Sequence, residues 1–292
     1  MENYDIVFIG QMGMGTIVPF EGPTFVELGS PVLFAAIAAS CLGKRIASVT
    51  TVSESEAYLL GPLRTAGVDL FVKPGETAQY RVVFPTPNVD ERQSFLIRGG
   101  GRIDEIPPFE PCLVHLCCIG VREFQLDLMR SLKAQGFRLS VDMQGFVLQA
   151  DDETGAVHLK DVPEKNEILS IADFVKLDAA EAQTLTGADV LQDQADILEK
   201  WGNSEIIITS SEGVLARIKG ETTFAKFTSR NTRGRMGRGD TVMGSYLAYR
   251  LDHSVEDSLR FAAALTSIKM ESPGPFTASV DDVIERMDER SP

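Results

Sequence analysis

Short apolar runs alternate with stretches of helical periodicity along most of the chain. Runs rich in β-branched residues predict buried strands at Tyr4–Gly10, Ile46–Val52, Val68–Val72, Leu113–Cys118, Arg138–Val141, Phe174–Leu177 and Glu205–Thr209. Between them, apolar residues recur with helical spacing in Pro31–Leu42, Glu54–Ala66, Glu123–Gln135, Ala179–Thr186 and Leu191–Trp201. This alternation predicts an α/β fold: a doubly wound, mostly parallel sheet flanked by helices, with ligands at the carboxyl ends of the strands.

Two segments break the rhythm. Thr16–Leu28 and Thr77–Ile97 alternate apolar and polar residues and contain prolines and glycines, without helical spacing. We expect them to form a small antiparallel β lid that stands off the main sheet. No repeat or linker divides the chain, so residues 1–292 are predicted to be a single domain with lid segments inserted at about 16–28 and 77–97.

Composition and charge exclude several classes of protein. Apolar residues make up 43% and charged residues 24% of the chain, which is an ordinary globular mixture. The formal net charge of −14 disfavours nucleic acid or an anionic membrane as a partner. Apolar runs are too short to span a membrane, so we expect a cytoplasmic location. The cysteine-containing run Cys112–Cys118 lacks a Cys-x-x-Cys element and predicts a buried strand with reduced thiols instead of a metal site.

The segment Gly237-Arg238-Gly239-Asp240 carries the chemistry. It immediately precedes an apolar-periodic stretch, Val242–Leu251. Glycines ahead of a helix allow a tight turn that directs backbone N–H groups at one spot, and the helix dipole makes that spot attractive to an anion. Asp240 lies beside it, where a carboxylate can accept a proton from a hydroxyl. An anion hole next to a base is the equipment for phosphorylating an alcohol.

Residues Gly234 to Asp240 resemble the C-terminal signature Asp-x-Thr-Gly-Ala-Gly-Asp of the PfkB/ribokinase-type carbohydrate kinases. Three further segments match family motifs in the family's order: Gly29-Ser30, Ala172–Glu181 and Ile206–Gly213. The resemblance covers most of the chain. It implies a ribokinase-like fold and a kinase that uses ATP and Mg²⁺.

The resemblance also implies roles for individual residues. Asp240 would accept the proton of the substrate hydroxyl, and the amides of Gly237, Arg238 and Gly239 would receive the transferred phosphoryl group. The Arg238 side chain replaces a small residue, and either reaches phosphate or pairs with surface carboxylates. On the cofactor side, the family pattern places a hydrated Mg²⁺ at Glu181 and the nucleotide around Asp178, Glu181, Thr209, Glu212, Gly213, Lys269 and Gly274. The alternatives are helix capping for the acidic pair, a plain strand-to-strand turn for Thr209–Gly213, and a helix-end charge for Lys269.

The expected substrate contacts are Gly10, Gly15, Gly29, Ser30, Phe34, Asp142 and Gln144. Gly15 and Phe34 stand where family members often have an aspartate and an asparagine that hold sugar hydroxyls, which disfavours ribose and fructose. Asp142–Phe146, Arg92-Gln93 and Leu265–Phe276 are similar to the branch that includes myo-inositol kinase. The predicted acceptor is therefore a sugar, cyclitol or related polyol, with a cyclitol first. Asp142 either reads its hydroxyls together with Gln144 or caps a turn.

Two other functions stay open at this stage. One is a kinase for a nucleoside or a vitamin-like alcohol, whose ring would stack on Phe34 and Phe20. The other is a non-catalytic ligand-binding relative of the kinases, against which the retention of Asp240 and its glycines argues. An exposed face of the lid strands favours pairing with a second copy, so a homodimer through the lid is also predicted.

Overall fold

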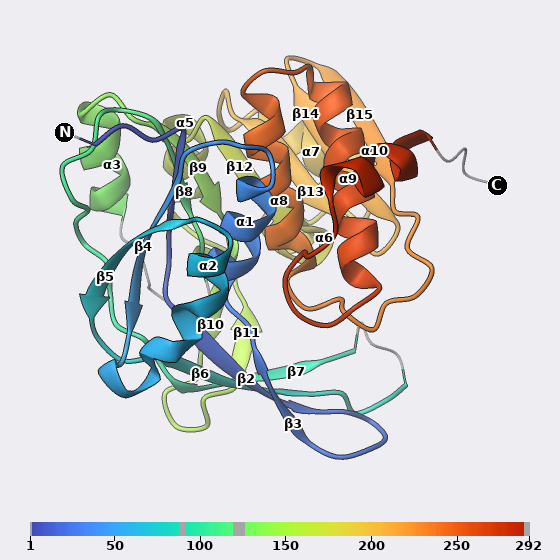
Figure 1. Cartoon of the computed structure of the whole chain (residues 1–292). Coiled ribbons are helices and arrows are strands. Elements are labelled where there is room, and N and C mark those ends of the chain that lie inside the picture. The colour runs from blue at the N-terminus through green and yellow to red at the C-terminus, as the bar shows by residue number, and fades with distance from the viewer. Residues whose placement is uncertain (1, 88–90, 119–125, 289–292) are drawn as a thin grey trace.

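The computed structural model describes residues 2–87, 91–118 and 126–288. Its centre is a nine-stranded sheet (Figure 1). In spatial order the strands are β15 (Glu221–Lys226), β14 (Gly213–Ile218), β13 (Glu205–Thr209), β12 (Phe174–Asp178), β9 (Arg138–Asp142), β8 (Leu113–Leu116), β1 (Ile6–Ile9), β4 (Ile46–Val52) and β5 (Asp69–Pro74). The strands from β13 to β5 run parallel, and β14 and β15 extend the sheet at one edge as an antiparallel pair.

Helices cover both faces of this sheet. They are α1 (Pro31–Ser40), α2 (Gly61–Thr65), α3 (Leu126–Ala134), α4 (Gln144–Val147), α5 (Lys165–Ile171), α6 (Ala179–Thr186), α7 (Leu191–Glu199), α8 (Arg238–Arg250), α9 (Val255–Met270) and α10 (Val280–Asp288). Successive side chains of β1 serve opposite cores: Val7 and Ile9 pack with α3, α5 and α7, whereas Ile6 and Phe8 pack with α1, α8 and α9. Because side chains alternate along a strand, a central strand buried on both faces is apolar throughout.

The predicted doubly wound architecture is confirmed, with local differences. The expected helix Glu54–Ala66 divides into a 3₁₀ turn, η1 (Glu54–Leu60), and α2. Pro62 lies in the first turn of the second piece, where its missing N–H costs no hydrogen bond. Sequence reasoning missed the edge strands β14 and β15, helix α10 and the hairpin of β10 (Leu148–Ala150) and β11 (Val157–Leu159). The first residues of the expected helix Glu123–Gln135 lie outside the described residues.

The lid is a separate four-stranded sheet in the order β3 (Phe25–Leu28), β2 (Gly13–Val18), β6 (Ala78–Val83) and β7 (Gln93–Arg98). Pairs β2–β3 and β6–β7 are antiparallel, as expected, and a parallel β2–β6 pair joins them. Figure 1 shows this sheet beyond the ends of the central strands, away from the chain termini. Within the described ranges, no helix is long and apolar enough to cross a membrane.

Candidate active site

The loop that leads into α8 is the backbone expected to form an anion hole. The Arg238 N–H donates to the Arg235 carbonyl at 3.1 Å, so the amides of Gly237 and Gly239 are the candidates that remain for a phosphoryl group. Gly237 caps the helix with φ of +75°, a left-handed conformation that strongly favours glycine. A β-carbon at this position would also clash with the ring of Phe34. Gly244, farther along α8, contacts the backbone of Ala35 so closely that α8 is pressed against α1. Backbone conformation and helix packing together fix where the first turn of α8 points.

Asp240 lies in that first turn and is half-buried. Loss of hydration raises its pKa to about 6, the charge of Asp142 adds to this, and the ammonium groups of Lys176 and Lys269 oppose it. At neutral pH the carboxylate is therefore mostly ionised, yet its pKa is near enough to neutrality for efficient proton exchange. These are the properties of a general base.

Lys176 lies at the centre of the site, and sequence reasoning assigned it no role. It is only 4% exposed, and its Nζ donates to Asp142 Oδ2 at 2.9 Å. A β-carbon built on Gly239 would lie 3.0 Å from this Nζ, so the ammonium group is next to the anion-hole backbone. The signal was available in the sequence, because Lys176 is the one charged residue in the otherwise apolar run Phe174–Leu177.

Lys176 is charged despite its burial. Burial alone would lower its pKa, but a surrounding ring of carboxylates outweighs that effect and raises it. The carboxylates are those of Asp142, Glu181, Asp240 and Asp178. A permanent positive charge beneath the anion hole therefore supplements the helix dipole.

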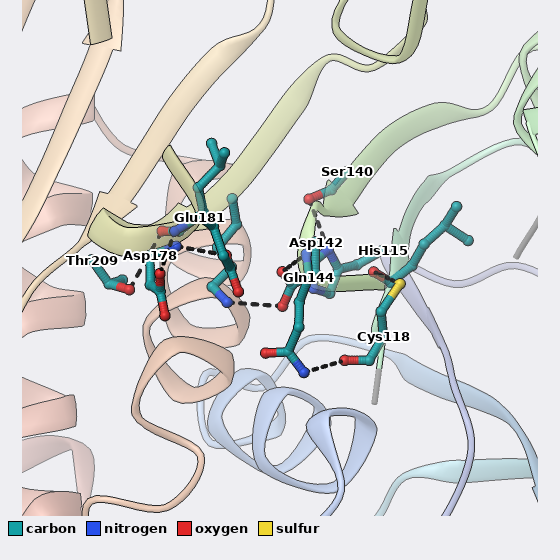
Figure 2. A network of polar contacts seen from close by, with 11 residues as sticks. His115, Cys118, Ser140, Asp142, Gln144, Asp178, Glu181 and Thr209 are labelled. Carbon is teal, nitrogen blue, oxygen red and sulfur yellow. Dashed lines mark hydrogen bonds and ion pairs between the residues drawn. The ribbon is translucent and has the colours of Figure 1, made fainter. Parts of the chain in front are cut away.

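Asp142 ends β9 and uses both of its carboxylate oxygens within the protein. Oδ1 accepts from the Gln144 backbone N–H at 3.0 Å and Oδ2 accepts from Lys176 (Figure 2). Burial raises the pKa of Asp142, and the Lys176 charge counteracts this. The turn-capping role considered from the sequence is thus present, and hydroxyl recognition by Asp142 stays a prediction. The Gln144 side chain donates from Nε2 to the Cys118 carbonyl at 3.1 Å.

A buried histidine, His115, lies on the strand next to the one that ends at Asp142. His115 Nδ1 and Ser140 Oγ are 2.8 Å apart on the neighbouring strands β8 and β9 (Figure 2). Burial, together with the nearby Lys176 charge, lowers the pKa of His115 to about 3. His115 is therefore uncharged at physiological pH and acts as a hydrogen-bonding wall of the site rather than as an acid.

Asp178 and Glu181 form a capping box at the start of α6. The Asp178 N–H donates to Glu181 Oε2 at 2.7 Å, and the Glu181 N–H donates to Asp178 Oδ1 at 2.8 Å. Burial raises the pKa of Glu181 to about 8, with a further contribution from the Asp178 charge. Thr209 lies beside them at the end of β13, with its Oγ1 3.7 Å from a β-carbon built on Gly239. Capping, the alternative considered from the sequence, is thus part of their role.

Asp178 and Glu181 are suited to a magnesium ion that keeps its waters, rather than to a metal held by protein side chains alone. Among the described residues, no group of three or more histidine, cysteine or acidic side chains is arranged to hold a metal. Mg²⁺ keeps several waters and commonly needs only one or two protein carboxylates together with substrate phosphates. Asp178 and Glu181 meet that requirement, and a cation nearby would offset the burial and the repulsion from Asp178 that raise the pKa of Glu181.

On the lid side, Tyr80 of β6 fills space that two glycines leave open. A β-carbon at Gly15 or Gly29 would clash with the Tyr80 side chain, whose hydroxyl donates to the Gly29 carbonyl at 2.6 Å. Burial raises the pKa of Tyr80, so the hydroxyl keeps its proton. Ser30 Oγ donates to the Gln11 carbonyl at 2.6 Å and ties the start of α1 to the base of the lid. Sequence reasoning missed Tyr80, which is one of several tyrosines without a local motif.

The structure places other expected site residues away from open contact with a ligand. Phe34 is 1% exposed and packs against Gly237, and the Lys269 ammonium lies 4.6 Å from the centre of its ring. Phe34 therefore supports the anion-hole loop instead of offering a face for stacking. Gly10 lies at the end of β1, against the backbone of Cys117.

The other residues expected on the nucleotide side lie in a turn after β13, in the last turn of α9 and in the loop after it. Glu212 and Gly213 form the tight turn between β13 and β14, where both N–H groups donate to Ser210 Oγ at 3.2 Å. This is the plain strand-to-strand turn considered as the alternative. Gly274 has a φ of +89° in the loop after α9. Lys269 is buried beneath the anion-hole loop and donates to the carbonyl oxygens of Gly234 and Met236.

Comparison with known proteins agrees with this geometry. Residues 35–282 match the model of the pfkB family of carbohydrate kinases, and the chain belongs to this family. It is 26% identical to a cytidine kinase of Thermococcus kodakarensis over 293 residues, which cover 94% of this chain and 99% of that protein.

Two solved structures are similar over nearly the whole chain. A pyrophosphate-dependent kinase in the ribokinase family, in a sulfate complex, has 30% identity and a TM-score of 0.87, covering 96% of this chain and 99% of that one. A pyrophosphate-dependent kinase in the ribokinase family, complexed with a pyrophosphate analog and myo-inositol, has 29% identity and a TM-score of 0.86 with the same coverage. The chain is thus a kinase with a ribokinase-like fold.

Proposed function

We propose that this kinase transfers a phosphoryl group from a polyphosphate donor to a hydroxyl of a cyclitol or related polyol. The observation that carries the proposal is the grouping of Asp240, the Gly237 and Gly239 backbone at the start of α8 and the Lys176 ammonium around one point. A base, a set of aimed N–H groups and a fixed cation are what in-line phosphoryl transfer to an alcohol needs.

The proposed step uses these groups as follows. Asp240 accepts the hydroxyl proton while the hydroxyl oxygen bonds to the transferred phosphorus, and the bond from that phosphorus to the leaving phosphate breaks. The anion-hole amides and Lys176 stabilise the negative charge on the transferred group. Mg²⁺, held near Asp178 and Glu181 through waters, would neutralise charge on the donor phosphates when bound.

For the donor, we propose pyrophosphate first and ATP, which the family resemblance implies, as the alternative. The chain has a net charge of −14, yet four arginines cluster around the start of α8. They are Arg230, Arg233 and Arg235, which precede the helix, and Arg238, its first residue. Guanidinium groups complement phosphate oxygens, so this local positive charge suits a donor that is phosphate alone. Two relatives at 29–30% identity use pyrophosphate. Lys269, expected on the nucleotide side, has its ammonium group bonded to the carbonyl oxygens of Gly234 and Met236.

For the acceptor, the wall that Tyr80 forms against Gly15 and Gly29 supports a cyclitol. Where family members often have an aspartate at the position of Gly15, this chain presents the aromatic ring of Tyr80. Such a ring suits a substrate with one apolar side better than ribose or fructose. A pyrophosphate-dependent relative binds myo-inositol. A nucleoside is the second candidate, favoured by the similarity to a cytidine kinase.

A matrix of donors and acceptors tests the proposal. The purified chain with Mg²⁺ is incubated with pyrophosphate or ATP and with myo-inositol, ribose, fructose or cytidine, and phosphorylated product is followed by ³¹P NMR. We expect turnover of myo-inositol with pyrophosphate, and none in an Asp240→Asn control. Efficient turnover of ribose would contradict the cyclitol proposal, and turnover of cytidine with ATP would favour the nucleoside alternative.

We also propose a homodimer through the lid. Phe25, Val26 and Ile97 of the lid strands are 48%, 66% and 58% exposed, more than apolar side chains of a monomer's sheet usually are. Sedimentation equilibrium of the wild type and a Val26→Lys variant tests this: the variant should be monomeric, and a wild-type monomer would refute it.

A further inference from the structure

A buried ammonium group holds the loop that forms the anion hole. Lys269 lies in the last turn of α9 and is 3% exposed. Its Nζ donates to the carbonyl oxygens of Gly234 and Met236, the residues that lead into Gly237. Two carbonyl oxygens converging on one buried positive charge are the ligand arrangement that oxygen-binding cations use in proteins.

The same ammonium group also interacts with α1, α8 and the lid, through one ring contact and two charges. It lies 4.6 Å from the centre of the Phe34 ring, and that ring packs under Gly237. The charges of Glu27, on lid strand β3, and Asp240, on α8, both act on it. Lys269 thus connects α9, α1 and the anion-hole loop at one point, within reach of the charge of a lid residue.

Backbone contacts fix the start of the loop independently of Lys269. The Gly234 N–H donates to the Met270 carbonyl at 2.8 Å, and a β-carbon at Gly234 would clash with Ser272. These contacts fix where the loop begins. The direction of the Met236 peptide, and therefore of the Gly237 amide that follows it, depends on what its carbonyl oxygen bonds to. That partner is Lys269.

We propose that Lys269 is a positioning residue, a built-in monovalent cation whose bonds to the Gly234 and Met236 carbonyls orient the anion-hole amides. It follows that removing the side chain leaves a site that a free monovalent cation of similar size, K⁺ or NH₄⁺, can occupy. The wild type, which carries its own cation, should then be indifferent to both ions. This inference rests on the proposed phosphoryl transfer for its kinetic readout only.

Burial gives the site a pH dependence. Loss of hydration lowers the pKa of Lys269 to about 8, and the negative charges of Glu27 and Asp240 oppose the shift. As pH rises through that value, Lys269 loses its proton and its positive charge, so its attraction for the two carbonyl oxygens weakens. Wild-type kcat should therefore fall above about pH 8, whereas a potassium ion in place of the side chain cannot lose a proton.

The test compares Lys269→Ala, which vacates the position of Nζ, with Lys269→Met, whose terminal methyl group fills it. Lys226→Ala, which removes an exposed lysine of β15, is the control. Each is measured with 100 mM KCl, NH₄Cl or choline chloride, so that ionic strength is constant. We expect kcat of Lys269→Ala in choline to be about 100-fold below wild type, since a displaced catalytic group costs rates of that order. Potassium or ammonium should restore most of it in Lys269→Ala and none in Lys269→Met.

Thermal unfolding gives a readout that needs no substrate. Potassium or ammonium should raise the Tm of Lys269→Ala by about 2–5 °C over choline, because a ligand that binds only the folded state stabilises it. Wild type, Lys269→Met and Lys226→Ala should show no such difference. If Lys269→Ala does not fold in choline, folding restored by KCl supports the same conclusion.

The outcomes separate the two proposals. Wild-type kcat in Lys269→Ala, or a loss that neither ion restores together with an unchanged Tm, would overturn the role of Lys269. A wild-type chain inactive with every donor and acceptor would refute the proposed function, while the thermal result would still decide whether the cation site exists.

Discussion

Replacing Lys176 by methionine separates the structural role of the buried lysine from its role in catalysis. The substitution keeps the side-chain volume but removes the charge that bonds Asp142 at 2.9 Å. Both side chains are nearly inaccessible, at 5% and 1% exposure, so Asp142 would be left as a buried charge without its partner. Breaking such a pair from one side typically costs about 3–5 kcal/mol of unfolding free energy.

The double variant Lys176→Met/Asp142→Asn removes both charges and should recover most of that loss, because a neutral pair of similar shape is often as stable as the buried ion pair. Lys133→Met is the matched control. Lys133 pairs with Asp173 at 2.7 Å, but the two side chains are 41% and 32% exposed, so the expected cost is only about 0–1 kcal/mol. Urea unfolding followed by circular dichroism measures all four proteins.

Activity should not follow stability in this series. Because Lys176 Nζ lies next to the Gly239 backbone, its loss should lower kcat by about 10²–10³-fold, the usual effect of removing one donor from an anion hole. The double variant should be stable and still inactive, assayed under conditions where every variant is folded. Recovery of kcat in the double variant would refute the proposed contact of Lys176 with the transferred group.

Three further outcomes follow from the site. The pKa of Asp240, raised to about 6 by burial, predicts that kcat/KM falls as pH drops below 6, because the base becomes protonated. Asp240→Asn should lower kcat about 10²–10⁴-fold. A pH profile that stays flat down to pH 4.5 would contradict this assignment. Gly237→Ala should fold but lose most of its kcat, because the φ of +75° and the Phe34 ring both oppose a β-carbon. The control is Gly43→Ala, at a glycine that also has a left-handed φ but open space around it. This variant should lose stability without a comparable loss of kcat. Hydrogen exchange in lid segments Thr16–Leu28 and Thr77–Ile97 should slow when a true substrate binds, and equal rates with and without it would argue against closure.

Sequence reasoning could single out the loop and the carboxylate proposed as anion hole and base because these residues are local. Gly237, Gly239 and Asp240 lie within four residues, and a glycine-rich turn before a helix has the same backbone consequences in any fold. The roles that depend on distant contacts were not predictable in this way. Phe34 was expected to face a substrate ring, but packing against Gly237 turned it into a support for the loop.

By itself, the sequence determined the layered α/β architecture, the small second sheet and the glycine-rich turn proposed for phosphoryl transfer, because periodicity and turn chemistry act between neighbours in the chain. Only the tertiary structure decided that Lys176 meets Gly239, that Tyr80 fills the space beside Gly29, and that Lys269 bonds the Gly234 and Met236 carbonyls. Each of these contacts joins segments far apart in sequence. Their meeting depends on the order in which strands and helices pack, and the pKa values of the buried charges depend on it in turn.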